Sequence, residues 1–238
     1  SIWLGNDPSG TTDTASYNIA VGTTALDAIT TGDKNSAIGH EALTANTSGE
    51  KNQAMGYRAL YANTTASNNI AIGDYAMKLN EQASYNIAIG TYALNNLNTT
   101  GNGNNVAIGG SALKYTTTGT QNTAIGNNAL RDNTTADKNT AVGYYALEAN
   151  TTGTYNTAVG YQALTANTEA DFNTAFGYAA LGSITGGGVE ACAQNTAVGY
   201  NALTNTTSST TSTAVGCGAL TTTTGANNNT AVGHNALT

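Results

Sequence analysis

The chain is poor in the residues that build disulfide scaffolds, linkers and membrane spans. Its 238 residues include two cysteines, one proline and one tryptophan, and only 9% are charged. Two cysteines are too few for a disulfide scaffold, so Cys192 and Cys217 are predicted to be free thiols. A single proline argues against a polyproline linker. No apolar run approaches the roughly 20 residues of a membrane span, and we expect no membrane insertion.

Histidine and positive charge are equally scarce. The formal net charge is −7, which makes nucleic acid an unexpected partner. His40 and His234 lie too far apart in the sequence to converge on a metal ion, which needs several ligands. No Ser-His-Asp set and no recurring carboxylate pair suggests acid–base chemistry. The chain is therefore predicted not to be an enzyme, with no catalytic residue, cofactor or metal.

What the chain does contain is one phrase, Asn-x-Ala-x-Gly-x-x-Ala-Leu, in thirteen copies. Ten of the twelve intervals between copies are seventeen residues, and the others are nineteen and twenty-two. A period this short and regular describes the coils of a solenoid. The copies begin at Asn18, Asn35, Asn52, Asn69, Asn86, Asn105, Asn122, Asn139, Asn156, Asn173, Asn195, Ser212 and Asn229.

Numbering the first residue of each phrase 0, position +2 is always Ala and position +4 always Gly. Alternation predicts a short strand with +1 and +3 on one face and +2 and +4 on the other. A second short strand is expected from Ala-Leu at +7 and +8, and Asn-Thr-Thr-Gly stretches such as residues 150–153 supply tight turns. The predicted fold is all-β, a parallel β-solenoid or β-roll of 17-residue coils. Residues 1–17 form a degenerate first coil and lead-in, and residues 18–238 the thirteen repeats.

Position +3 is always large and apolar, and position +8 is Leu except at Met77. We expect these side chains to form buried columns, and glycine +4 to sit where a side chain would collide with a neighbouring backbone. A strand that is apolar or tiny on both faces is usually covered on both. Because a thin roll buries little alone, we expect a homotrimer. The predicted core residues are Val21, Ile38, Ile72, Ile89, Ile108, Ile125, Val142, Val159, Val198, Val215, Val232, Leu147 and Leu164.

The form Asn-Thr-Ala-Val-Gly-Tyr-x-Ala-Leu at 139–147, 156–164 and 195–203 resembles the repeats of phage tail-fibre proteins. Its centre is similar to the Ala-Ile-Gly repeat of trimeric autotransporter adhesin heads, which are left-handed parallel β-rolls. The resemblance covers the whole chain and implies a segment of a longer virion protein. That segment would be a rigid trimeric rod for attachment to a glycan or protein on the host surface. A bacterial surface adhesin head is the alternative.

Two columns of side chains bear on function. Tyrosine recurs at +5, and the candidate receptor-facing residues are Tyr144, Tyr161, Tyr178 and Tyr200. Stacking that stabilises the turns is the favoured alternative for them. Position +1 is Thr in the last seven copies, and a Thr row spaced about 4.8 Å is also typical of an ice-binding solenoid. The insertion at 182–194, with Gly186-Gly187-Gly188, is either a binding loop or a bulge.

Overall fold

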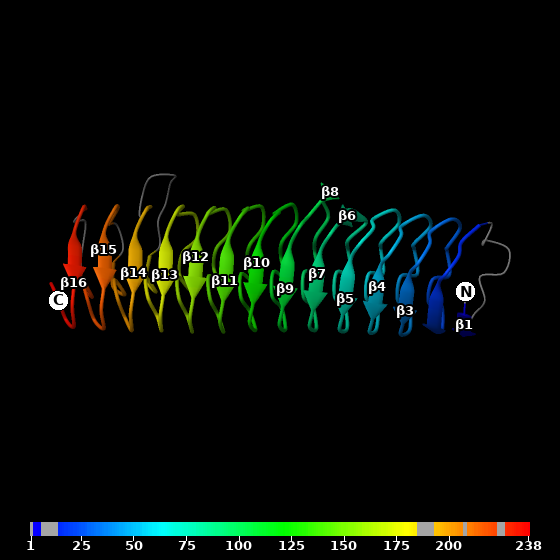
Figure 1. The fold of residues 1–238 in the computed structure, drawn as a ribbon, viewed down its shortest axis with the longest axis horizontal. Helices are drawn as coiled ribbons and strands as arrows, with labels where there is room; N and C mark the ends of the chain where they lie inside the picture. Colours follow the sequence, from blue (N-terminus) through cyan, green and yellow to red (C-terminus); the bar gives the residue numbers. More distant parts are fainter. Residues whose placement is uncertain (1, 6–13, 185–192, 207–208, 223–226) are drawn as a thin grey trace. The chain divides into compact units, whose positions relative to one another are not determined.

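The computed structural model describes residues 2–5, 14–184, 193–206, 209–222 and 227–238. The Gly186-Gly187-Gly188 stretch, Cys192 and most of the lead-in lie outside the described residues, and the two interpretations of the insertion therefore stay open. The chain forms two compact units, Ser1–Thr120 and Gln121–Thr238. Every regular element in the described residues is a β-strand (Figure 1).

The first unit is a parallel sheet that contains one strand from each coil. Each strand pairs with the next in the register of the repeat, so that Leu4 lies beside Val21 and Ala20 beside Ala37. Two further short strands, β6 (Gln82–Ser84) and β8 (Thr100–Asn102), pair with each other around the nineteen-residue coil. The strands of the main sheet are β1 (Ile2–Gly5), β2 (Ile19–Gly22), β3 (Ser36–Ile38), β4 (Gln53–Met55), β5 (Ile70–Ile72), β7 (Ile87–Ile89) and β9 (Val106–Ile108).

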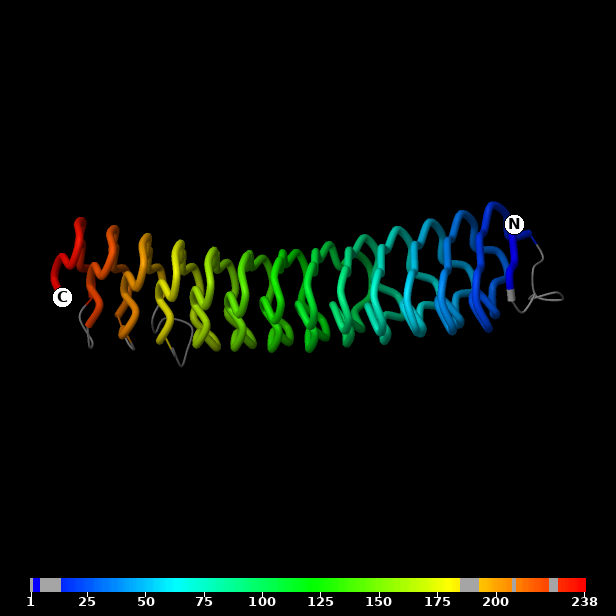
Figure 2. Tube along the Cα trace, turned by 90° about the horizontal axis from the view of Figure 1, so that it is seen from below, coloured from blue at the N-terminus to red at the C-terminus, as the bar shows by residue number. Residues whose placement is uncertain are grey.

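The second unit repeats this arrangement, and Figure 2 shows the similar path of successive coils within it. The twenty-two-residue interval does not disturb the register, because Ala175 still pairs with Ala197. The strands are β10 (Thr123–Ile125), β11 (Thr140–Val142), β12 (Thr157–Val159), β13 (Thr174–Phe176), β14 (Thr196–Val198), β15 (Thr213–Val215) and β16 (Thr230–Val232).

The predicted all-β parallel solenoid is confirmed, but each described phrase contributes one strand rather than two. The Ala-Leu segment is not a strand because alternate residues in it are left-handed, with φ of 57° at Tyr145 and 53° at Leu147. Strand backbone has negative φ. Coils nevertheless remain joined here, since the Leu147 N–H donates to the Ala163 carbonyl at 2.9 Å.

The interior of each unit is filled by alanine and leucine. The Ala side chains at +2 are buried in every copy, and those at +7 and the residue at +8 are buried in every copy except the last, where Leu237 is exposed; Leu147 and Leu164 are fully buried. In all thirteen phrases the buried residue at +2 is Ala, which has the smallest side chain that can fill the interior there. The strand alternates, so the larger +3 side chain must point outward.

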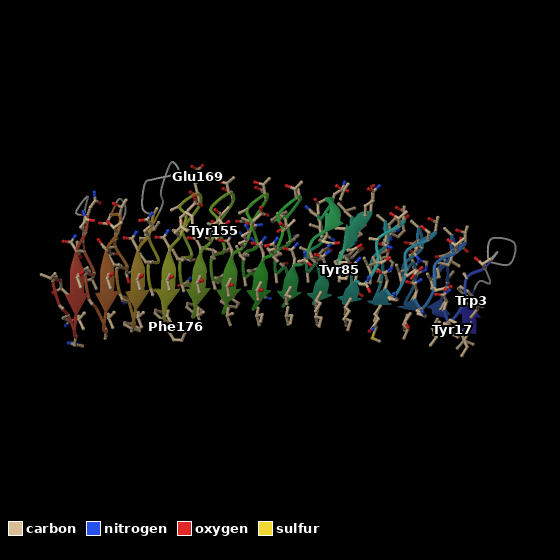
Figure 3. The ribbon with its side chains drawn as sticks, turned by 45° about the horizontal axis from the view of Figure 1, so that its top comes forward. Trp3, Tyr17, Tyr85, Tyr155, Glu169 and Phe176 are labelled. Carbon is tan, nitrogen blue, oxygen red and sulfur yellow. The ribbon has the colours of Figure 1, made fainter. Side chains whose placement is uncertain are left out.

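The expectation that +3 forms a buried column is therefore wrong for the single chain. Val232 is 70% exposed and Ile38 is 39% exposed, and Figure 3 shows Phe176 pointing away from β13. The other predicted core residues at +3 are exposed at Ile125, Val198 and Val215 and half-buried at Val21, Ile72, Ile89, Ile108, Val142 and Val159.

Glycine +4 behaves as predicted. Gly143 has φ of +139°, which L side chains rarely adopt, and a Cβ there would collide with the carbonyl oxygen of Gly160. The same contact recurs between successive glycines in both units, for example from Gly73 to Gly90. These glycines let neighbouring coils approach at the end of each strand.

Candidate functional site

The buried polar groups hold the coils together. At position 0, the Asn173 N–H donates to Oδ1 of Asn156 at 2.9 Å, and Asn156 Nδ2 donates to the Ala170 carbonyl at 2.7 Å. One side chain thus joins two coils and closes the turn of its own coil. Buried amides need such partners, which explains why Asn recurs at this position.

A second asparagine ladder at +11 was missed by sequence reasoning, which took these residues only for turn formers. Asn150 Nδ2 donates to the Gly153 carbonyl at 2.9 Å, and Asn167 Nδ2 donates to Asn150 Oδ1 at 2.9 Å. Leu97 and Ile184, both buried, occupy +11 in the two coils that carry extra residues. The seventeen-residue recurrence of Asn at +11 was the available signal.

Several carboxylates act as acceptors in turns. The Ser16 N–H donates to Asp33 Oδ1 at 2.7 Å, and the Thr154 N–H donates to Asp171 Oδ1 at 2.5 Å. These acids therefore satisfy backbone groups of the preceding coil. Within the described ranges, no group of three or more His, Cys, Asp or Glu side chains could hold a metal ion.

The first exposed candidate is the outer sheet face, which we define as the side chains at +1 and +3 of the main strands. In the first unit its central part is aliphatic throughout and half-buried: Ile70, Ile72, Ile87, Ile89, Val106 and Ile108. In the second unit a Thr column at +1 runs beside an aliphatic or aromatic column at +3. In the described strands of either unit, this face has no charged side chain.

The second candidate is the tyrosine ladder at +5 in the second unit. Tyr144, Tyr161, Tyr178 and Tyr200 stack in turn, with ring centroids 5.6, 5.2 and 5.0 Å apart and planes within 13° of parallel. Each ring is exposed by 42 to 54%. Because the faces stack on one another, the ladder presents ring edges and hydroxyl groups to solvent. Stacking is therefore present, and a receptor-facing role stays a prediction.

The ladder begins with a second contact in its own coil. Tyr145 packs edge-on against Tyr144 with centroids 4.1 Å apart. Its hydrogen bond, followed by desolvation, raises the pKa of Tyr144 above the usual value. The Tyr144 hydroxyl group therefore remains protonated at neutral pH and can both donate and accept hydrogen bonds.

The first unit has a different row at the same edge of its sheet. Tyr75 and Tyr92 stack with centroids 5.0 Å apart, and Tyr57 meets Tyr75 edge-on at 5.1 Å. Lys78 lies over Tyr75, and Lys114 lies over Tyr92 at 5.0 Å. We call this row the cation–tyrosine strip: Tyr57, Arg58, Tyr61, Tyr75, Lys78, Tyr92, Lys114 and Tyr115.

Arg58 is the cation of the strip that has a carboxylate partner. Its guanidinium lies over Tyr57 and Tyr61 and donates to Glu41. That hydrogen bond, more than the charge itself, holds the pKa of Glu41 below its usual value and raises that of Arg58. Arg58 is therefore neutralised locally.

No protein-family model, curated protein or solved structure matches the chain. In the described part of the molecule there is also no helix with the length and apolarity to cross a bilayer. The case for a function accordingly depends on the repeat and on the three exposed surfaces.

Proposed function

We propose that the chain is the structural and receptor-binding segment of a phage tail fibre. It works as a rigid homotrimer that attaches a virion to a glycan or protein on the host surface. The observation that carries this proposal is the outer sheet face, which leaves a column of large apolar side chains half in water in a single chain. Contiguous apolar patches of this kind favour a protein interface.

A trimer accounts for two features at once. It covers the Ile and Val columns of the first unit, and it pairs or bridges the Thr hydroxyl groups of the second. The interior of each coil is already filled, so recognition falls to the edges and turns outside the interface. The tyrosine ladder supplies hydroxyl groups there, in a row parallel to the stacking of the coils.

The first test is the mass of the protein in solution, by light scattering. The parent should contain three chains, and Ile89→Asp should give monomers that keep the β circular dichroism spectrum, because a charge enters the apolar interface. Thr118→Asp, at an exposed turn position, is the matched control and should stay trimeric. A monomeric parent would refute the trimer.

The second test is adsorption. Fluorescent trimers should bind cells of a susceptible bacterium, and the double variant Tyr161→Ser and Tyr178→Ser should bind fewer cells while remaining trimeric. Binding that the double variant retains in full would assign recognition to another surface. A bacterial adhesin head remains the alternative, and the flanking sequence separates the two: a virion-attachment or chaperone domain against a membrane anchor.

Ice binding is the second candidate, and one observation favours it. Thr140 and Thr157 lie on the outward face of the sheet, beside Val142 and Val159, and a flat row of this kind can order water at about 4.8 Å intervals. This function needs the same face uncovered, so it excludes a trimer built on that face. Inhibition of ice recrystallisation by a monomeric protein would support it.

A further inference from the structure

The few positive charges of this acidic chain are unevenly distributed. Of seven Lys and Arg residues, three belong to the cation–tyrosine strip. All but one of the cation–ring contacts in the described residues lie in this strip: Arg58 over Tyr57 and Tyr61, Lys78 over Tyr75, and Lys114 over Tyr92 and Tyr115. The strip is thus a positive row on an otherwise negative molecule.

Two of these three charges are available to a ligand. Arg58 is bound to Glu41, and the nearby Asp74 accepts the Tyr57 N–H at 2.9 Å. Across the described ranges, neither Lys78 nor Lys114 forms an ion pair with a carboxylate. Both are half-buried against tyrosine rings, which limits the freedom that their side chains lose on binding.

The spacing of the two lysines restricts the ligand. They stand at +9 of coils that are two steps apart, so their backbones are separated by roughly 10 Å along the stack. Double-stranded DNA carries one charge per about 1.7 Å, far denser than this row, and the net charge of −7 would repel it. A polymer with sparse charges fits better.

We propose that the cation–tyrosine strip binds an extended anionic glycan that runs along the stack of coils. Carboxylates or sulfates separated by about one disaccharide meet Lys78 and Lys114. Sugar hydroxyl groups between them hydrogen-bond to the hydroxyl groups of Tyr75 and Tyr92, whose faces are occupied by stacking. This inference rests on the proposed function and names the receptor class for the first unit.

Exposed ion pairs are individually weak. Three parallel copies in a trimer raise the apparent affinity by effective concentration, provided that one polymer or one cell surface engages more than one strip. The binding should weaken with ionic strength, because both lysines are accessible to counterions.

The experiment uses the whole chain and hyaluronan, which has one carboxylate per disaccharide, with neutral dextran as the reference. Biolayer interferometry should detect hyaluronan but not dextran, and binding should fall as salt is raised. The double variant Lys78→Gln and Lys114→Gln should lose about tenfold or more in affinity. Lys78→Arg and Lys114→Arg together should retain most of it.

The matched control removes the same charge from the same unit at position −1, through Lys34→Gln and Lys51→Gln. It should bind like the parent. If the control variant lost as much affinity for hyaluronan as the Lys78 and Lys114 variant, the binding would depend on net charge and not on the strip, and the proposal would be wrong. Hyaluronan binding no stronger than dextran binding would also overturn it. Failure here leaves the mass and adsorption tests of the fibre function intact, and a monomeric chain that binds hyaluronan would refute only the trimer.

Discussion

In the first unit, both outward columns of β5, β7 and β9 are Ile or Val, whereas every strand of the second unit has Thr at +1. The aromatic rows differ in the same way. Tyr75 and Tyr92 are flanked by Lys78 and Lys114, while the four ladder tyrosines of the second unit stack without a cation–ring contact between the described residues. The buried positions of the two units are nearly identical.

This comparison separates what the coil requires from what it permits. Ala at +2, Gly at +4 and Asn at 0 each contact the equivalent residue in the next coil. A substitution at one of these positions therefore affects the contacts with the coils on both sides. Positions +1, +3, +5, +6, +9 and +10 point away from the interior and can vary without disturbing the stack. Functional differences between the units are therefore expected only at these outward positions.

The largest effect should come from a residue that both units share. Gly73→Val and Gly143→Val each put a β-branched side chain on a backbone with φ of +125° or +139°, against the next glycine. We expect each to destabilise the protein by more than about 4 kcal/mol and to prevent folding, as measured by circular dichroism and soluble yield. Thr151→Val, in a turn, should be mild. Tolerance of valine in one unit alone would show that the two interiors are not equivalent.

The two asparagine ladders should differ in cost. Asn156→Ala leaves the Asn173 N–H and the Ala170 carbonyl without their buried partner, which should cost about 2–4 kcal/mol in urea unfolding. Asn150→Leu copies the natural choice at Leu97 and should cost about 2 kcal/mol or less, because apolar contact replaces part of the lost bonding. If Asn150→Leu cost more than Asn156→Ala, the ladder at +11 in the turn, rather than the ladder at position 0 before the strand, would contribute more to holding the coil closed.

The period, the strand and the parallel stacking could be predicted from the sequence because alternation and spacing act locally. The sequence did not allow us to predict which face of each strand points into the coil. Both candidate faces, Ala and Gly on one side and Val or Ile on the other, are free of charge, and hydrophobicity alone assigns the larger side chain to the interior. The narrow coil reverses this assignment, since Ala141 fits inside and Val142 does not.

The site was predictable only in part. The +5 tyrosines were visible as a column, but the spacing does not show whether their rings stack face to face or point apart, and the structure shows that they stack. The residues of the cation–tyrosine strip come from four different repeat positions, +5, +6, +9 and +10. No single one of these positions repeats the same residue type through the strip, so the strip is not visible as a column in the sequence. Only the fold brings Lys114 against Tyr92, twenty-two residues earlier.

The tyrosine rows offer a smaller effect. Tyr161→Ser removes two stacking contacts and should lower stability by about 1–2 kcal/mol, and Tyr75→Ser in the first unit should cost a similar amount. Tyr17→Ser is the control, because that ring is 76% exposed and should be nearly neutral. Thermal melting measures all three. Tyr161→Phe should keep the stability while removing the hydroxyl group, and so separates stacking from recognition.

The smallest effect concerns one carboxylate in each unit. Arg58 lowers the pKa of Glu41, so the folded state binds this proton less tightly than the unfolded chain does. The stabilisation is present above the ordinary pKa of 4.5 and disappears as the pH falls through the lower folded value. Glu41→Gln should therefore reduce the melting temperature slightly at neutral pH and have no effect in strong acid.

Glu148 in the second unit should behave in the opposite way. Desolvation, only partly offset by Arg131, raises its pKa, so the charged form is disfavoured in the folded state and the penalty is relieved as the pH falls through the folded value. Glu148→Gln should be neutral or slightly stabilising at neutral pH, and this advantage should vanish below the ordinary pKa. The melting temperatures of both variants and of the parent, measured across the acid range, test the two predictions together. If the two variants changed the melting temperature in the same way with pH, the opposite environments inferred for Glu41 and Glu148 would be contradicted.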